Sequence, residues 1–427
     1  MSFAPGWFVV ALAFAGSGGP ALGAQSAQDV EAIRSAAFAS TAAAELLREL
    51  CDRVGPRLTG SPGHALAVEH VAAKLAAVGL RTTRDRESIA HAWQRGPVRA
   101  RITAPIQREL AAAAAPWTPG FAEPRALRVV TRAPAKDDAV LVDPRQFPIG
   151  PRRAHPFAAA GAVLVDSARP RALLATGAAT FAAPFVPAAV PAVFVTAEDA
   201  ALLRRLLDAG DDVTIELSGG GTVLGETAVE ELVAALPGAT GDGELVLAFC
   251  GLDSLDLGTG ATADGAGAAV LVEAARILAS LGRPPARTIR FAFLAGTAQG
   301  AGSSLYAKRR AAELPRHRLA FGIEGGAGRL LGLMLDGDRA ELERMESFFA
   351  PLRDFGATDV GYRAPRTALT RALRDAGVPA FAFVQEAPEW GIVDGTAADT
   401  FDKVLARDLQ EASCVLATVL WAAANER

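Results

Sequence analysis

From Leu232 onward the sequence alternates short apolar runs with longer helical segments, and this alternation limits the possible folds more than any other feature. The apolar runs predict strands at 245–250, 288–295, 319–324 and 378–384, with helices between them and over 404–424. Such alternation is typical of an α/β fold, in which a mostly parallel mixed sheet is covered by helices on both faces. Sites in these sheets form where the strands end and the loops begin.

The segment before this half is also helical in pattern. Residues 36–50 have the composition of one helix, and a second helix follows a loop rich in glycine and proline. Ser61 is its expected N-cap, with Pro62 at the first helical position and Gly79 at the end. His64 and His70 lie in this stretch, and we interpret them as surface or capping histidines rather than as ligands.

Short strand-like runs occupy the middle of the chain: AVLVD from Ala139, GAVLVDS from Gly161, PAVFV from Pro191 and VTIEL from Val213. Thr196 and Asp199 form the pattern of a capping box before a helix. These runs predict a small β-rich α+β domain inserted over 116–221. The main domain would then be made of residues 25–115 and 222–427.

The first 24 residues resemble a secretory signal, because an apolar core over 7–15 is followed by small residues at Ala21 and Gly23. A buried helix is the alternative, since no Lys or Arg precedes the core. We expect export to the periplasm or cell envelope and no membrane span after signal cleavage. Cys51, Cys250 and Cys414 fit no metal pattern and are expected as buried thiols, or as one disulfide and one free thiol.

The composition excludes one class of partner. The 427 residues carry a formal net charge of −4, with both signs mixed along the chain. No basic stretch is present, so we expect no nucleic-acid binding.

Four glycine-rich loops follow the predicted strands. They read GLDSLDLGTGATADGAG from Gly251, GTAQG from Gly296, EGGAG from Glu324 and VDGTAADTFDKV from Val393. In these motifs the chain resembles the M28 zinc peptidases, in particular the carboxypeptidase Q-like branch. The CDRVGPRLTGSPGH stretch from Cys51 strengthens the resemblance, and the inserted block resembles a protease-associated domain.

The resemblance implies two zinc ions held by two histidines and three carboxylates, with a glutamate as general base. In this chain the matching positions carry other residues. The metal-ligand positions hold Gly251, Ala263, Ala298, Gly326 and Gly395, and the general-base position holds Thr297. Glycine and alanine have no donor side chain, and threonine is no base at neutral pH. The sequence therefore predicts no zinc cofactor and no family-type catalysis.

Acidic residues that would support the metal ligands are retained as Asp253, Asp264 and Asp399. Without ligands they have nothing to orient. We interpret Asp253, Asp256 and Asp264 as groups that cap backbone amides or the start of a helix. A magnesium or calcium site on these oxygens is the alternative.

Two functions remain open at this point. The chain is a non-catalytic homologue that binds a peptide or a protein partner, a second copy of itself included, or it is an exported aminopeptidase or dipeptidase with an unrecognised site. If the loops keep their geometry, restoring the five ligand residues should restore zinc binding.

Overall fold

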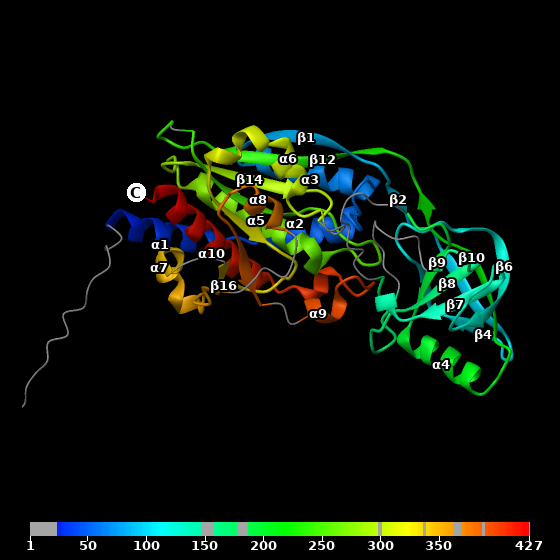
Figure 1. The fold of residues 1–427 in the computed structure, drawn as a ribbon. Coiled ribbons are helices and arrows are strands. Elements are labelled where there is room, and N and C mark those ends of the chain that lie inside the picture. Colours follow the sequence, from blue (N-terminus) through cyan, green and yellow to red (C-terminus); the bar gives the residue numbers. More distant parts are fainter. Residues whose placement is uncertain are drawn as a thin grey trace, which may run out of the picture.

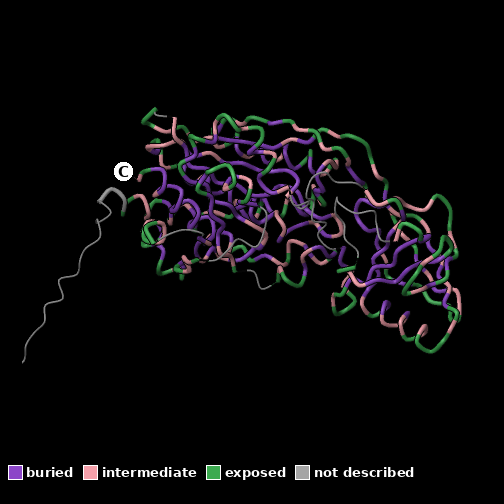
Figure 2. Tube along the Cα trace, in the orientation of Figure 1, coloured by how far each residue is buried: buried purple, intermediate pink, exposed green. Residues whose placement is uncertain are grey.

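The computed structural model describes residues 24–146, 157–176, 187–241, 243–297, 301–335, 339–362, 369–386 and 389–426. The chain forms a large body and a smaller one, which lie side by side (Figure 1). Each body has a sheet of eight strands and its own buried interior (Figure 2). The expected signal segment lies outside the described residues, except for its last residue.

The large body is built on a mixed sheet with strand order β1-β12-β14-β13-β15-β18-β16-β17. Its four central strands run parallel from β14 to β18, as the alternating pattern predicts. Antiparallel pairs flank this centre, because β12 pairs antiparallel with β1 and β14, and β16 pairs antiparallel with β18. The strands are β1 (Arg81–Ile89), β12 (Thr227–Leu236), β13 (Leu245–Gly251), β14 (Thr288–Leu294), β15 (His317–Ile323), β16 (Leu330–Leu335), β17 (Gly361–Tyr362) and β18 (Ala380–Gln385).

Helices cover both faces of this sheet, which confirms the expected α/β architecture (Figure 1). The larger core packs one face against α1 (Ala24–Phe38), α2 (Ala42–Glu49), α3 (Pro62–Ala77), α5 (Ala266–Ser280), α7 (Arg339–Phe349) and α10 (Ala406–Asn425). The smaller core packs the other face against α6 (Ser304–Arg309) and α8 (Arg371–Asp375). Strand β13 is buried along its whole length, so its end lies deep in the body.

Shorter helical segments connect these elements. They are η1 (Leu50–Val54), η2 (Pro144–Gln146), η3 (Ala261–Gly265), η4 (Ala311–Arg316), η5 (Ala350–Phe355), α9 (Trp390–Val393) and η6 (Phe401–Lys403). None of the helices within the described residues is long and apolar enough to cross a membrane.

The N-terminal helices differ in part from the prediction. The helix expected over 36–50 is interrupted after Phe38 and resumes at Ala42, so it is divided between α1 and α2. The second helix has the predicted cap, because Ser61 Oγ accepts a hydrogen bond from His64 N. The expected surface position of His64 is wrong, because its side chain is buried. The three cysteines are buried free thiols, as expected.

The second sheet has strand order β4-β3-β10-β6-β7-β8-β9-β5. Its strands are β3 (Val98–Ala104), β4 (Arg108–Leu110), β5 (Ala112–Ala114), β6 (Phe121–Val130), β7 (Asp138–Val142), β8 (Ala162–Asp166), β9 (Ala192–Val195) and β10 (Thr214–Gly219). Helix α4 (Ala197–Asp208) begins at the predicted cap, because Thr196 Oγ1 accepts from Asp199 N. A two-stranded ribbon of β2 (Trp93–Gln94) and β11 (Thr222–Val223) closes the entry and exit of this unit.

The expected start of the insert at residue 116 is too late. Three strands of the second sheet precede it, and β3 already contributes buried Ala100 and Ile102 to the core of the small body. These strands are short and rich in arginine and alanine, so their apolar alternation is weak. The small body therefore begins near residue 98 and ends near residue 219.

Candidate functional site

The four glycine-rich loops meet at the carboxyl ends of the central strands. Gly326 N, after β15, donates to Thr262 O at 2.7 Å, and Thr259 N donates to Asp399 O at 2.9 Å. Leu252 N donates to Leu294 O at the end of β14, at 2.9 Å. The loops expected to form one site are thus in contact, as the parallel strands predict.

The space around Gly251 is filled by two neighbouring side chains. A Cβ atom at Gly251 would lie 2.1 Å from Asp264 Oδ2 and 2.2 Å from Thr297 Oγ1. No side chain fits there while these two residues keep their positions. The vacated histidine position is therefore closed by the residues around it. Of the other expected positions, Ala298 lies outside the described residues.

Two further positions have backbone conformations that favour glycine. Gly326 has a φ of +136° and Gly395 a φ of +71°. An L-residue at either angle is strained, and more so at Gly326. The loops have thus adopted backbone geometries in which the aspartate and histidine implied by the resemblance would be strained.

Asp253 is buried and connects three segments of the chain. Its Oδ2 accepts from Thr59 Oγ1 at 2.9 Å, and its Oδ1 accepts from Thr297 N at 3.1 Å and also from Thr297 Oγ1. The prediction that Asp253 caps backbone amides is confirmed. It orients a threonine in place of a histidine.

Thr297 lies between two carboxyl groups, because its Oγ1 also contacts Asp264 Oδ2 at 2.9 Å. A hydroxyl has one proton to donate, so a second proton is needed to satisfy both contacts. Burial and the neighbouring Asp253 raise the pKa of Asp264 to about 7, which keeps a proton available there. The prediction that Asp264 caps the following helix is wrong, since α5 has no side-chain N-cap bond.

Arg57 is the fully buried cation of this site, and no motif reasoning predicted a role for it. Its guanidinium donates to four backbone carbonyls: Leu252 O at 3.0 Å, Gly55 O at 3.2 Å, Thr259 O at 2.6 Å and Gly260 O at 2.7 Å. Burial lowers its pKa, and the carboxyl groups of Asp264, Asp399 and Asp253 offset part of that effect. Arg57 thus fixes the path of the 252–260 loop. Its place in the GPRLTG motif was the available signal.

The last loop carries two further acids. Asp399 Oδ1 accepts from Thr262 N at 2.7 Å, so this residue joins the loops after β13 and β18. Burial raises the pKa of Asp399. Burial and the neighbouring Asp399 raise the pKa of Asp394 to about 6.

Glu231 on β12 is a buried acid that sequence reasoning missed. Its Oε1 accepts from Ala295 N at 3.3 Å, one residue before the Gly296 loop, and its Oε2 has no hydrogen-bond partner among the described residues. Burial raises the pKa of Glu231 to about 8, so it is neutral near pH 7. Two adjacent glutamates on β12, of which only Glu231 is fully buried, give no pattern that would mark one of them as a site residue.

An ion pair joins the site loop to the entry of the small body. Asp256 Oδ1 accepts from Arg95 Nη2 at 2.5 Å, and the Arg95 guanidinium stacks 4.8 Å from the Trp93 ring centroid. Asp256, expected as a capping residue, instead connects the two bodies through this pair.

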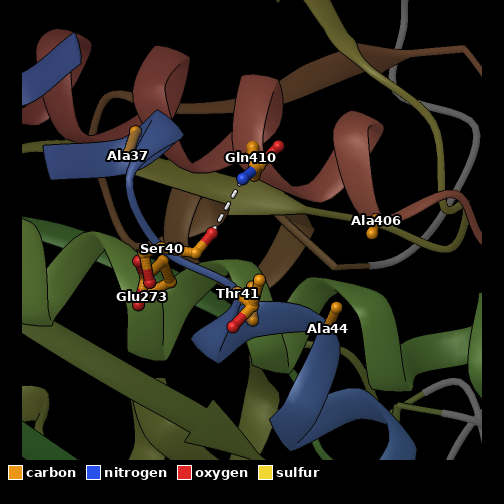
Figure 3. Close-up of a pocket in the computed structure, with 8 residues that line it drawn as sticks. Ala37, Ser40, Thr41, Ala44, Glu273, Ala406 and Gln410 are labelled. Carbon is orange, nitrogen blue, oxygen red and sulfur yellow. Dashed lines mark hydrogen bonds between the residues drawn. The ribbon is translucent and has the colours of Figure 1, made fainter. Parts of the chain in front are cut away.

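A separate small cavity is formed by helices α1, α2, α5 and α10 (Figure 3). Its volume is about 20 Å³, which suits one water molecule. Gln410 crosses it to donate to Ser40 O at 2.8 Å. No loop residue of the site lines this cavity, so it is unrelated to the site.

The residues at the matched positions do not fit zinc. Within the described parts of the chain, no group of three or more His, Cys, Asp and Glu side chains is placed to hold a metal ion. Asp253 and Asp264 instead form hydrogen bonds with Thr297 Oγ1, and the charge of Asp253 raises the pKa of Asp264. We derive no metal-dependent step from this site.

Comparison with known proteins finds the M28 peptidases, the family that the loop motifs resemble. The family model described as Peptidase family M28 matches residues 231–419. A solved structure of a peptidase M28 precursor from Shewanella amazonensis is 25% identical with a TM-score of 0.81, over 94% of this chain and 97% of that one. A zinc aminopeptidase from Bacillus subtilis, 17% identical with a TM-score of 0.66 over 90% of this chain and 94% of that one, shares the fold. The fold is thus that of the M28 peptidases.

Sequence comparison finds relatives among the carboxypeptidase Q proteins of mammals. Mouse carboxypeptidase Q is 26% identical over 404 residues, which cover 89% of this chain and 85% of the mouse protein. Rat carboxypeptidase Q is 27% identical over 237 residues, 55% of this chain and 50% of the rat protein. The chain belongs to the M28 peptidase family, as the motifs predicted.

Proposed function

We propose that this protein is an exported, non-catalytic member of the M28 peptidase family that binds a peptide or a protein partner. One observation carries the proposal: the space that the first zinc ligand would need is taken by Asp264 and Thr297. A hydrolytic site needs a polarised water and a base. The described residues at these positions provide no metal ligand, and the base position holds a threonine.

The hydrogen bonds that order the loops of the site favour a binding role over a loss of all function. Arg57 donates three hydrogen bonds to the 252–260 loop, and Asp253 and Asp399 join this loop to other segments. These bonds hold the loops in one arrangement at the carboxyl ends of the strands, where sites form in sheets of this kind. The ordered loops therefore support a binding role.

The proposal is tested on protein purified without chelators. We expect less than about 0.1 zinc per chain by elemental analysis and no hydrolysis of leucine p-nitroanilide or of a dipeptide panel. The zinc aminopeptidase from Bacillus subtilis provides the positive control for leucine p-nitroanilide, and a mammalian carboxypeptidase Q provides it for the dipeptides. One or two zinc ions per chain, with hydrolysis that EDTA abolishes, would overturn the proposal. Hydrolysis that survives EDTA would favour the second function, a peptidase with an unrecognised site.

Export is a separate part of the proposal, supported by the apolar segment over 7–15 and the small residues at Ala21 and Gly23. We expect the mature protein in the periplasmic or envelope fraction of its cell. N-terminal sequencing should then begin near residue 24. A mature chain that begins at Met1 would contradict signal cleavage.

A further inference from the structure

The small body extends a segment onto the last loop of the site. We call residues 167–176 the strap. Ala175 forms an antiparallel bridge with Thr396, and Thr176 N donates to Gly395 O at 3.1 Å. Both strap residues are buried in this contact. The strap therefore forms one β-bridge with the loop that carries Gly395, the position at which the family resemblance implies a histidine.

A side chain of the strap strengthens this pairing. Arg169 Nη1 donates to Gly391 O at 2.5 Å, and its Nη2 lies 3.5 Å from Asp394 O. Arg169 also lies close enough to the Asp394 carboxyl group to lower that group's pKa against the effect of burial. Arg169 thus holds residues 391–394, which lead directly into the residues with which the strap pairs.

The strap's own backbone opposes this arrangement. Ala168, Arg171 and Ala172 have φ values of 53°, 65° and 52°, in the left-handed region that non-glycine residues avoid. Strain of this kind persists only where the surroundings impose it. Release of the strap would relieve the strain, whereas docking restores the main-chain pairing.

We propose that the backbone edge of 394–396 is a recognition site for an extended peptide, and that the strap occupies this site as an intramolecular competitor. The inference rests on the proposed peptide-binding function and gives it a location. Recognition by an added strand uses main-chain hydrogen bonds for affinity and side-chain fit for selectivity. The tight burial of Ala175 opposite Thr396 selects a small residue at that position of the peptide.

The test uses a fluorescein-labelled peptide with the strap sequence, SARPRALLAT, and the full-length protein. The matched control peptide is SARPRALLAP, because proline lacks the N–H that Thr176 donates to Gly395 O. Fluorescence anisotropy measures both affinities. We expect SARPRALLAT to bind and SARPRALLAP to bind at least about tenfold more weakly.

Two variants change the competition in opposite directions. Arg169→Ala should weaken strap docking and tighten peptide binding by about tenfold, since the open fraction rises. Arg171→Ala, which changes a neighbouring exposed arginine, should leave the affinity unchanged. The pair Ala175→Cys and Thr396→Cys should form a disulfide, because facing residues of an antiparallel pair lie about 4.5 to 5.5 Å apart. The oxidised form should bind no peptide, and reduction should restore binding.

Several results would overturn the inference. They are equal affinity of the two peptides, equal affinity of the oxidised and reduced double-cysteine protein, no gain for Arg169→Ala, and failure of the disulfide to form in folded protein. Thermal melts confirm that each variant is folded. This test and the zinc test can fail separately. Zinc-dependent hydrolysis would overturn the proposed function, whether or not the strap peptide binds. A zinc-free protein that does not bind the strap peptide would overturn only this inference.

Discussion

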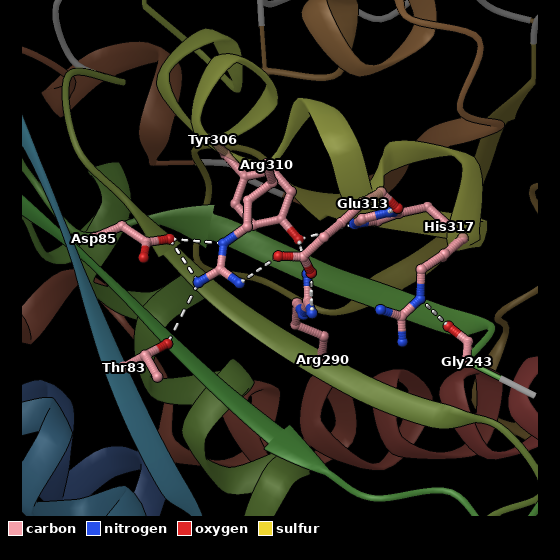
Figure 4. Close-up of polar contacts among 9 residues, drawn as sticks. Thr83, Asp85, Gly243, Arg290, Tyr306, Arg310, Glu313 and His317 are labelled. Atoms are coloured by element: carbon pink, nitrogen blue, oxygen red, sulfur yellow. Dashed lines mark hydrogen bonds and ion pairs between the residues drawn. The ribbon is translucent and has the colours of Figure 1, made fainter. Parts of the chain in front are cut away.

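Two buried polar clusters of the large body satisfy their charges in different ways. On the sheet face covered by α6 and η4, Arg310 pairs with Asp85 and Glu313, and Arg290 pairs with Glu313 (Figure 4). Opposite charges meet directly there. At the loop site, by contrast, Asp253 and Asp264 share a threonine, and the Arg57 guanidinium donates only to carbonyls among its described contacts.

This difference distinguishes a network of direct ion pairs from a site in which buried acids share hydrogen bonds. The α6 network also includes neutral His317, whose pKa burial lowers to about 4. Its Nδ1 contacts Glu313 O at 3.0 Å and therefore carries the hydrogen, so its Nε2 accepts from the Tyr306 hydroxyl at 2.9 Å. At the site the acids outnumber the cations, and burial raises the pKa of Asp264, Asp394 and Asp399. Such an excess of acids is what two divalent cations would otherwise balance.

The largest effect is expected at the buried cation of the site. Arg57→Ala would leave the carbonyls of Leu252, Thr259 and Gly260 without their donor and remove the charge that faces three acids. We expect a loss of at least about 4 kcal/mol in the free energy of unfolding. Urea unfolding measures it, with exposed Arg53→Ala as the control. A loss below 1 kcal/mol would show that Arg57 is dispensable to the loops.

The strands and the loop motifs could be predicted from the sequence, whereas the contacts within the site could not. The apolar runs located β13, β14, β15 and β18 because those strands are buried on both faces and read as continuous hydrophobic segments. The glycine and alanine substitutions could likewise be read directly from the loop motifs.

The contents of the site depend on contacts that no local pattern encodes. Arg57 reaches carbonyls about 200 residues away, as its bond to Thr259 O spans 202 residues. Thr297 meets Asp264 only because two strands place their ends together, and the strap reaches Thr396 from another body. The early strands of the second sheet were missed because alanine and arginine carry little strand signal.

The next largest effect on stability is expected at the buried, protonated Glu231. The pKa of Glu231 is about 8 in the folded protein and near 4.5 when unfolded, so the folded state holds its proton longer. Stability should therefore fall as pH rises from about 4.5 to 8. Glu231→Gln removes this dependence and should be more stable than the original protein at pH 9, by on the order of 3 kcal/mol. The two should be similar near pH 5. Thermal unfolding across this range measures the effect.

The neighbouring Glu230→Gln is the control for this prediction. Glu230 is partly exposed and pairs with Arg86 at 2.7 Å, so its loss should not produce a gain that grows with pH. Identical pH profiles for the original protein and Glu231→Gln would contradict the assignment of a neutral buried glutamate.

A smaller effect is expected in the α6 network. Tyr306→Phe removes the hydroxyl that donates to His317 Nε2 and accepts from Arg290 Nη1 at 3.1 Å. Because the remaining ion pairs hold the network, we expect a loss of about 1 to 2 kcal/mol in the free energy of unfolding. Tyr362→Phe, at a residue 54% exposed, should change stability by less than about 0.5 kcal/mol. Equal effects of the two substitutions would contradict the structural role given to Tyr306.

The smallest effect is expected where the motif comparison alone predicts the largest. Gly251→His, Ala263→Asp, Ala298→Glu, Gly326→Asp and Gly395→His together restore the ligand residues implied by the family resemblance. The structure reverses the expectation that they restore the site, because Gly251 has no room for a Cβ and two other glycines have positive φ.

We therefore expect the five-fold variant to bind less than about 0.1 zinc per chain by elemental analysis after dialysis against micromolar zinc. Ligands that must first displace Asp264 and Thr297 and bend two loops bind a metal weakly, since the metal's binding free energy must cover that rearrangement. Adding Thr297→Glu removes one obstructing atom but keeps Asp264 Oδ2 at 2.1 Å from the Cβ position. Stoichiometric zinc in either variant would show that the loops readjust at little cost, and that the side chains alone distinguish this site from a metal centre.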